Sequence, residues 1–291
     1  MKLVRYTHAG RIGVGALSVN GETIVDLAEV GGIDRFPYSM AAFLARGAAG
    51  LAEAEELAAS APLNAHVPLS AARLLAPVGD PPKIICIGQN YRDHCEEQNQ
   101  PIPERAIIFA KYATALNNPG GEILLPHISS PVDYEAELAF VIGKGGRDIS
   151  QSTAMAHVAG YMCANDVSAR DIQFGDKQWV RGKTFDSFFP TGPYLVTASE
   201  APDPHNLDIS LTLNGATMQS SNTSNLVFNV PYLVSYLSQV VTLQPGDIIS
   251  TGTPGGVGVF RKPPVFLKPG DEVSVTISGL GTLTNRVAAR D

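Results

Sequence analysis

The sequence predicts a mixed, β-rich α+β fold in which a small N-terminal α/β domain precedes a larger domain. Three runs alternate apolar and polar residues as half-buried strands do, namely 134–143 (YEAELAFVIG), 208–219 (DISLTLNGATMQ) and 271–278 (DEVSVTIS). Gly, Pro and Asn separate these runs, whereas the first part of the chain adds an Ala-rich helical stretch. With 291 residues, 44% of them hydrophobic, the chain can fill a large core.

The N-terminal domain is expected to begin with three strands. They are predicted at 2–6, 13–19 and 23–27, and the pair Asn20-Gly21 is typical of a tight hairpin turn between the last two.

An Ala-, Leu- and Glu-rich helix is predicted next, over 39–60. Gly47 and Gly50 can break it in two, because glycine weakens a helix interior. A connector then leads into a new strand, so we place a domain boundary near residue 72. The domains are therefore 1–72 and 73–291.

The larger domain is predicted to be mostly strands, starting at 83–88 (KIICIG). Two helices are expected to interrupt it, one over 150–162 and one that Pro231 opens and that continues to residue 240. Pro-Gly-Asp turns at 245–247 and 269–271 should each lead into a strand.

Composition and charge argue against several classes of protein. Cys86, Cys95 and Cys163 are odd in number and lack C-x-x-C spacing, so we expect neither a disulfide framework nor a zinc knuckle. A net charge of −7 with scattered Lys and Arg argues against a nucleic-acid partner. No stretch approaches the roughly 18 apolar residues of a membrane span. We therefore expect a soluble, cytoplasmic protein with no membrane partner.

Glu135 and Glu137 give the strongest local signal for a functional site. Side chains at i and i+2 of a strand share a face, so both carboxylates point the same way. At about 5–7 Å in apolar surroundings they would repel by roughly 3 kcal/mol at an effective dielectric near 20. A hard cation such as Mg²⁺ would relieve this repulsion. The alternative is a solvated strand face or two separate ion pairs.

Asp166 is the candidate third ligand. It lies in the polar segment 165–173 (NDVSARDIQ), directly after the apolar stretch that we expect to be helical. Three carboxylates leave about three of six octahedral positions for a bidentate substrate and a water. From the residues alone, Asp166 can equally be the N-cap of a helix that begins in SARDIQ.

His94 and Glu97 are candidates for acid–base chemistry. They are three residues apart in GQNYRDHCEEQ, which places them on one side of a helical turn. A carboxylate fixes the tautomer of an imidazole and raises its basicity, so His94 could activate water near neutral pH. A surface pair without function is the alternative. Cys95 would face another side of the turn, so we discount it as a nucleophile.

Lys183 lies in RGKTFDSFFPTGP, where phenylalanines surround it in sequence. A lysine in such surroundings should pair with an anion, for example a substrate carboxylate or an enolate. A surface lysine paired with Asp186 is the alternative.

The glycine-rich segment 246–260 is not expected to bind a nucleotide. It lacks the Gly-Lys-Ser/Thr ending of a phosphate loop and opens no clear helix. Its glycines can instead let backbone amides and the Thr253 hydroxyl approach a carboxylate closely.

Five motifs occur in one order along the chain: GxNYxxHxxE, YEAELAxVIGK, NDVSARDxQ, GKxFDxFxPxGP and GDxIxTGTPxGVG. From about Lys83 to Val287 the chain resembles the fumarylacetoacetate hydrolase family. Stretches such as DHCEEQNQPIP are similar to the branch called fumarylacetoacetate hydrolase domain-containing protein 2. Residues 1–72 resemble the small N-terminal domain of many bacterial members.

This resemblance implies mixed β-sheets rolled around an active site, a homodimer, a small 2-oxo acid substrate, and bound Mg²⁺ or Mn²⁺, with Ca²⁺ also possible. The residues that match the family's functional positions are the metal ligands Glu135, Glu137 and Asp166, the water-activating pair His94 and Glu97 on a lid, Lys183, which polarises the substrate carbonyl or stabilises an enolate, and the substrate-positioning Arg170, Gln173 and Thr253.

The resemblance implies enolate chemistry with several outcomes. We expect hydrolysis of a C–C bond in an acylpyruvate-like acid, in which His94 delivers the water. Oxaloacetate tautomerisation or decarboxylation and isomerisation of a 2-hydroxydienedioate are alternatives at the same site. A metal-stabilised binding protein without catalysis is a distant alternative. A two-carboxylate glycosidase is rejected because Glu135 and Glu137 lie side by side rather than opposed.

Overall fold

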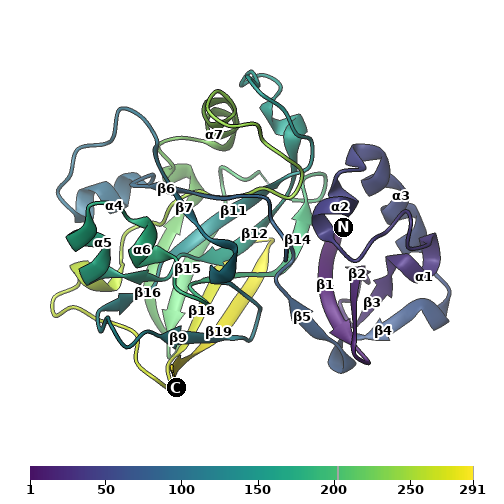
Figure 1. Cartoon of the computed structure of the whole chain (residues 1–291), viewed down its shortest axis with the longest axis horizontal. Coiled ribbons are helices and arrows are strands. Elements are labelled where there is room, and N and C mark those ends of the chain that lie inside the picture. Colours follow the sequence, from purple (N-terminus) through teal and green to yellow (C-terminus); the bar gives the residue numbers. More distant parts are fainter. Residues whose placement is uncertain (202, 291) are drawn as a thin grey trace.

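The computed structural model describes residues 1–201 and 203–290, and one mixed sheet of twelve strands runs through both halves of the molecule (Figure 1). Its main path is β4-β3-β2-β1-β14-β12-β11-β17-β6-β7, while β5 pairs with β1 and β8 with β14. The strands of this sheet are β1 (Lys2–His8), β2 (Arg11–Leu17), β3 (Thr23–Asp26), β4 (His66–Pro68), β5 (Arg73–Leu75), β6 (Ile84–Gly88), β7 (Ile107–Lys111), β8 (Leu116–Asn117), β11 (Ala136–Ile142), β12 (Val158–Asn165), β14 (Phe189–Thr197) and β17 (Ile248–Ser250).

A second sheet of five strands packs against β11, β12 and β14. Its order is β16-β15-β18-β19-β9. These strands are β9 (Glu122–Leu125), β15 (Asp208–Leu213), β16 (Ala216–Asn222), β18 (Glu272–Ile277) and β19 (Gly281–Ala289). The short strands β10 (Val132–Asp133) and β13 (Ser168–Ala169) form a separate antiparallel pair next to the main sheet.

The central strand β11 is buried along its whole length. Leu138 and Phe140 pack into the core shared with the second sheet, whereas Ala139 and Val141 face the core shared with the N-terminal helices. A strand covered on both faces reads as a continuous apolar run, as AELAFVI does. The end of β11 therefore offers a rigid base for the functional groups beside it.

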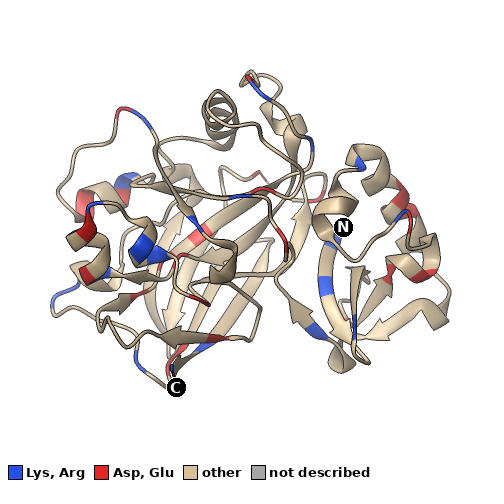
Figure 2. Cartoon of the chain, viewed as in Figure 1, with Lys and Arg blue, Asp and Glu red and all other residues tan. Residues whose placement is uncertain are grey.

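Helices lie around the outside of the sheets (Figure 1), and α1–α3 contribute to the core that Ala139 and Val141 of β11 share. Acidic and basic residues are interspersed over both parts of the molecule (Figure 2). Among the described residues, no helix is long and apolar enough to cross a membrane. The α-helices are α1 (Leu27–Gly31), α2 (Met40–Leu44), α3 (Gly47–Ser60), α4 (Arg92–Glu97), α5 (Arg170–Asp176), α6 (Val180–Lys183) and α7 (Val230–Ser238), and the 3₁₀ turns are η1 (Leu63–Ala65), η2 (Leu69–Ala71), η3 (Ala113–Ala115), η4 (Ala154–His157), η5 (Thr223–Asn225) and η6 (Gly258–Phe260).

Most predicted elements are present, with shifted ends. The predicted helix over 39–60 is divided into α2 and α3, and Gly47 adopts a left-handed φ of 67° at the break, whereas Gly50 lies inside α3. Helix α7 begins after Asn229, whose side chain accepts from the Tyr232 amide as an N-cap.

The predicted helix over 150–162 is wrong. The structure has the short turn η4 followed by strand β12. Its Ala and Met residues favour a helix in isolation, but β12 is buried along its length and pairs with both β11 and β14. Tertiary pairing therefore outweighs local propensity here.

The domain boundary near residue 72 stays a prediction. Strands on both sides of it belong to the same sheet, because β1 pairs with β5 and with β14. Phe36, Phe43 and Leu44 from the N-terminal part share a core with Ala139 and Val141 of β11.

Candidate active site

Glu135, Glu137 and Asp166 converge at the adjacent ends of β11 and β12, and we call them the carboxylate cluster. One oxygen from each lies within 4.8 Å of the others, and all three residues are buried. Antiparallel pairing places Asn165 opposite Ala136, and the Asp166 amide donates to the Glu135 carbonyl at 2.9 Å. The strand pairing thus joins two motifs that are 29 residues or more apart in sequence.

Asp166 is not a helix cap. The residue before α5 is Ala169, and it makes no side-chain cap. Asp166 is fully buried, with Oδ2 2.9 Å from Lys183 Nζ and Oδ1 2.6 Å from Lys111 Nζ. Its carboxylate therefore belongs to the buried charge network.

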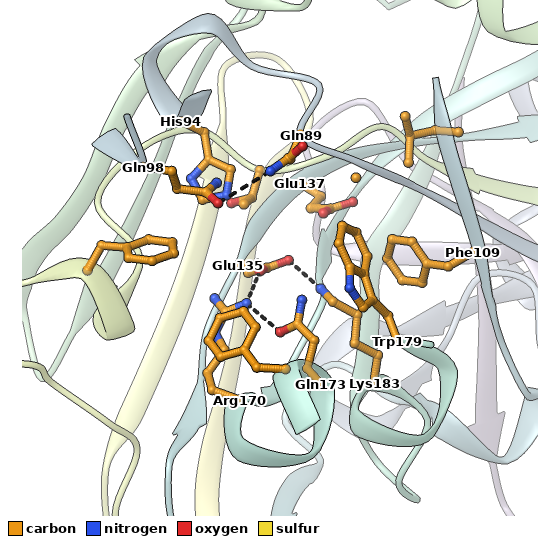
Figure 3. A pocket seen from close by; sticks show the side chains of 15 residues that line it. Gln89, His94, Gln98, Phe109, Glu135, Glu137, Arg170, Gln173, Trp179 and Lys183 are labelled. Atoms are coloured by element: carbon orange, nitrogen blue, oxygen red, sulfur yellow. Dashed lines mark hydrogen bonds and ion pairs between the residues drawn. The ribbon is translucent and has the colours of Figure 1, made fainter. Parts of the chain in front are cut away.

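Glu135 is held in its charged form by two cations. Lys183 Nζ donates to its Oε2 at 2.8 Å, and Arg170 Nη1 donates to its Oε1 at 2.7 Å (Figure 3). Burial alone would raise the pKa of Glu135, but Lys183 and Arg170 outweigh burial and lower that pKa to about 2. Glu135 is therefore an anion near neutral pH.

Lys183 is a buried cation rather than a surface residue. Burial lowers the pKa of Lys183, but Asp166 and Glu135 more than compensate and raise it above its usual range. The alternative pairing with Asp186 is wrong, because Asp186 lies 3.8 Å from Arg290 and is exposed. Lys183 Nζ also lies 5.0 Å from the centre of the Phe109 ring.

Glu137 is the member of the cluster with no cationic partner of its own. Its Oε2 accepts from the Ser250 hydroxyl and, at 3.0 Å, from the Gly252 amide. Among the described residues, no Lys or Arg forms an ion pair with it. Burial raises the pKa of Glu137 well above its usual range, and the neighbouring Asp166 and Glu135 raise it further.

The cluster fits a divalent metal ion because its donors are oxygen atoms and its charge is incompletely balanced. Hard cations such as Mg²⁺ and Mn²⁺ select carboxylate oxygens. Lys183 places a positive charge beside Glu135 and Asp166 but forms no ion pair with Glu137. A cation bound close to Glu137 would supply the missing positive charge.

His94 and Glu97 form the predicted pair, which we call the His–Glu dyad. His94 Nδ1 lies 3.2 Å from Glu97 Oε2 within α4, and the other carboxylate oxygen of Glu97 accepts from the Gly256 amide at 2.9 Å. His94 is 7% exposed and lines the same pocket as Glu135 and Glu137 (Figure 3). With Nδ1 directed at Glu97, Nε2 is the ring nitrogen available to a substrate.

Arg170, Gln173 and Thr253, which the family resemblance names as substrate-positioning residues, also line this pocket. Gln173 Oε1 accepts from Arg170 at 2.9 Å, so its amide hydrogens remain for a ligand. Thr253 Oγ1 accepts from Gln219 Nε2 at 2.8 Å, which leaves its hydroxyl hydrogen as a donor. The cavity is small, about 50 Å³, and its apolar wall consists of Ile87, Phe109, Phe174, Trp179 and Phe260.

The glycine-rich segment holds carboxylates, but they belong to the protein. Its amides donate to three of them: Gly252 to Glu137 at 3.0 Å, Gly256 to Glu97 at 2.9 Å, and Gly258 to Asp133 at 2.8 Å. At Gly258 a side chain is excluded, because an added Cβ would lie 1.9 Å from the Val265 carbonyl oxygen. This one segment therefore ties the carboxylate cluster to the His–Glu dyad.

Two charged residues of the site were missed by the sequence analysis. Asp133 is fully buried and lies 2.8 Å from both Nε and Nη2 of Arg170, so it orients that guanidinium towards Glu135. Lys111 balances Asp166 and donates to the Val167 and Phe188 carbonyls at 3.2 and 3.0 Å. The only sequence signal for Lys111 is that it is a lone lysine in the apolar strand IIFAK.

The family model "Fumarylacetoacetate (FAA) hydrolase C-terminal" matches residues 83–288. "Oxaloacetate tautomerase FAHD2A, mitochondrial" of Bos taurus is 50% identical over 292 residues, which cover 99% of this chain and 91% of the relative. The Homo sapiens protein of the same name is 48% identical over the same shares of the two chains.

Solved structures of similar proteins have the same fold over the whole chain. Fumarylacetoacetate hydrolase from Exiguobacterium antarcticum superposes with a TM-score of 0.86 at 35% identity, and each chain is covered completely. A 5-carboxymethyl-2-hydroxymuconate delta-isomerase from Mycobacterium smegmatis gives a TM-score of 0.79 at 35% identity, again over both whole chains. The predicted fold class is therefore confirmed.

The predicted cytoplasmic location is contradicted by these comparisons. The Bos taurus and Homo sapiens tautomerases named above are both named as mitochondrial proteins. Cysteine spacing and net charge do not determine the compartment of a protein, since compartments are selected by targeting segments.

The expectation of an enzyme is confirmed, and the distant alternative of a binding protein without catalysis is therefore wrong. This chain is an enzyme that belongs to the fumarylacetoacetate hydrolase family.

Proposed function

We propose that this enzyme is a divalent-metal-dependent tautomerase that interconverts the enol and keto forms of oxaloacetate. The names of its most similar relatives favour this reaction over the C–C bond hydrolysis that the sequence analysis placed first.

The observation that carries the proposal is that His94 lines one pocket together with Glu135 and Glu137 of the carboxylate cluster (Figure 3). Tautomerisation moves one proton between C3 of the substrate and the oxygen on C2. Glu97 holds Nδ1 of His94, so Nε2 can take the proton from C3 or return it. Water need not attack carbon in this reaction, and the same residues therefore suffice without hydrolysis.

The second requirement is to stabilise negative charge on the C2 oxygen. Mg²⁺ or Mn²⁺ held by Glu135, Glu137 and Asp166 would polarise that oxygen and hold the adjacent carboxylate. Lys183, kept charged beside Glu135 and Asp166, can donate a hydrogen bond to the same oxygen.

Two further groups would orient the substrate within this arrangement, and a third would orient a metal ligand. The free donors of Gln173 and Thr253 suit the carboxylate next to C2. Arg170 orients Glu135 rather than the substrate, since its own hydrogen bonds go to Asp133, Glu135 and Gln173.

The test is a direct assay of enol-to-keto conversion. Purified protein is stripped with a chelator, reloaded with Mg²⁺ or Mn²⁺, and mixed with freshly dissolved enol-oxaloacetate, whose ultraviolet absorbance is followed. We expect fast conversion with metal and a rate reduced by about 10²–10⁴ in His94→Ala. His8→Ala, on β1 in the N-terminal part, is the matched histidine control and should keep the wild-type rate.

Parallel reactions with acetylpyruvate and fumarylpyruvate separate the alternatives. Cleavage of either acid at a rate above the tautomerisation of oxaloacetate, lost in His94→Ala, would instead support the hydrolase. Full activity in the metal-free protein would contradict the scheme for every one of these reactions.

A further inference from the structure

Two glutamines form an amide pair at the dyad side of the pocket (Figure 3). Gln89 lies between β6 and α4, and Gln98 is the residue that ends α4, one turn beyond His94. Gln89 Nε2 donates to Gln98 Oε1 at 3.4 Å. Both side chains are half-buried and line the cavity beside the imidazole.

The pair has donors left for a ligand. Two primary amides carry four N–H groups, and their mutual hydrogen bond uses one of them. This count is the same whichever way round the two amides are oriented. Within the described part of the chain, no other group accepts from either side-chain amide. Up to three donors can therefore reach an acceptor in the cavity.

The cations of the pocket are occupied elsewhere. Arg170 directs Nε and Nη2 at Asp133 and Nη1 at Glu135 and Gln173. Lys183 bridges Glu135 and Asp166 at the metal end. A second carboxylate on the substrate, remote from the metal end, therefore meets neutral amide donors rather than a free guanidinium.

We propose that Gln89 and Gln98 determine specificity by binding the second carboxylate, C4, of a four-carbon 2-oxo dicarboxylic acid. This inference rests on the proposed function. In oxaloacetate the reacting carbon C3 lies between C2 and C4. With C2 at the carboxylate cluster and C4 at the amide pair, C3 lies next to His94, which precedes Gln98 by one helical turn.

The test compares two acids that differ only at C4. Oxaloacetate carries a carboxylate there, and 2-oxobutanoate carries a methyl group. Exchange of the C3 hydrogens in D₂O is followed by NMR for both, and KM and kcat are obtained for wild type, Gln98→Glu and Gln89→Asn. Asparagine is chosen at position 89 because the backbone there has a φ of 51°, which asparagine tolerates.

We expect Gln98→Glu to raise KM for oxaloacetate by about tenfold or more, since a charge-assisted hydrogen bond is replaced by repulsion. The ratio of kcat/KM for oxaloacetate to kcat/KM for 2-oxobutanoate should therefore fall by about tenfold, because 2-oxobutanoate carries no carboxylate at C4 for the amide pair to bind. Gln89→Asn, whose shorter side chain loses reach, should shift the same ratio in the same direction by a smaller factor. Gln100→Glu is the charge-matched control, because Gln100 is exposed and lies outside the pocket.

The outcomes separate this inference from the proposed function. If wild type fails to exchange the C3 hydrogens of oxaloacetate, the proposed function fails, and this inference falls with it. If wild type is active but Gln98→Glu changes KM for both acids equally, the amide pair only supports α4 and the specificity role is wrong. An equal effect of Gln100→Glu would overturn it in the same way.

Discussion

Glu135 and Glu137 of the carboxylate cluster and His94 of the His–Glu dyad line one pocket, but the cluster and the dyad are built differently. The cluster is no more than 5% exposed and stands at the ends of two central strands that are paired along their length. The dyad belongs to the six-residue helix α4, and the Glu97 side chain is 20% exposed. The cation site is thus fixed by the paired strands of the core, whereas the proton-transfer group lies on a short helix that the glycine-rich segment holds through Glu97.

Glu135 and Glu137 of the carboxylate cluster also differ from each other. Glu135 has two cationic partners and a lowered pKa, while Glu137 has none of its own and a raised pKa. Two carboxylates on one strand therefore differ in what they need. Glu135 is stable as an anion in the protein alone, and Glu137 gains most from a bound metal ion.

The largest effect is expected at Lys111, which links the cluster to the core. Lys111→Met leaves Asp166 Oδ1 without its counter-charge and the carbonyls of Val167, Lys183 and Phe188 without their donor. This should reduce the free energy of unfolding by about 3–5 kcal/mol. Denaturant unfolding measures this, with the exposed Lys268→Met as the control within about 0.5 kcal/mol. A loss below about 1 kcal/mol would show that the cluster is not anchored in this way.

Glu137→Gln should separate metal binding from folding. The neutral amide removes a ligand and its charge, so we expect affinity for Mn²⁺ to fall at least about a hundredfold by calorimetric titration. The stripped variant should be no less stable than stripped wild type, because repulsion from Asp166 and Glu135 is relieved. Unchanged Mn²⁺ affinity would remove Glu137 from the ligand set.

Glu97→Gln should affect rate without affecting metal. An amide can still hold Nδ1 of His94, but it stabilises the imidazolium less than a carboxylate does, so we expect kcat to fall about 10–100-fold. Mn²⁺ affinity should remain within about twofold of wild type. If both quantities fall together, the cluster and the dyad are not separable and the comparison fails.

Thr253→Val is expected to have the smallest effect. Valine keeps the shape but removes the hydroxyl donor, and Gln219 Nε2 keeps its other acceptor, the Pro254 carbonyl. KM for the 2-oxo acid should rise about threefold to tenfold, with kcat nearly unchanged. A fall in kcat without a change in KM would instead place Thr253 in the chemical step.

Some of the site could be predicted because local spacing is informative. Glu135 and Glu137 share a face by strand geometry alone, and the spacing of His94 and Glu97 requires only one helical turn. The family motifs then placed Asp166 beside them. In each case the partner is either near in sequence or carried by a motif.

The remainder depended on contacts that no local pattern contains. Asp133 meets Arg170 from 37 residues away, and Lys111 donates to the Phe188 carbonyl from 77 residues away. Strand β12 was mistaken for a helix because its small apolar residues suit both structures and only its two neighbouring strands decide. Buried counter-charges of this kind can be identified only when the pairing of the strands is known.

The claim that the carboxylate cluster binds the metal ion while the His–Glu dyad transfers the proton is tested most directly by one titration. The rate of C3 hydrogen exchange in oxaloacetate is measured against Mg²⁺ concentration for wild type and His94→Ala. We predict that both curves saturate at the same Mg²⁺ concentration, while the plateau of His94→Ala is lower by about 10²–10⁴. A wild-type plateau in His94→Ala, or full exchange in wild type without metal, would contradict the account.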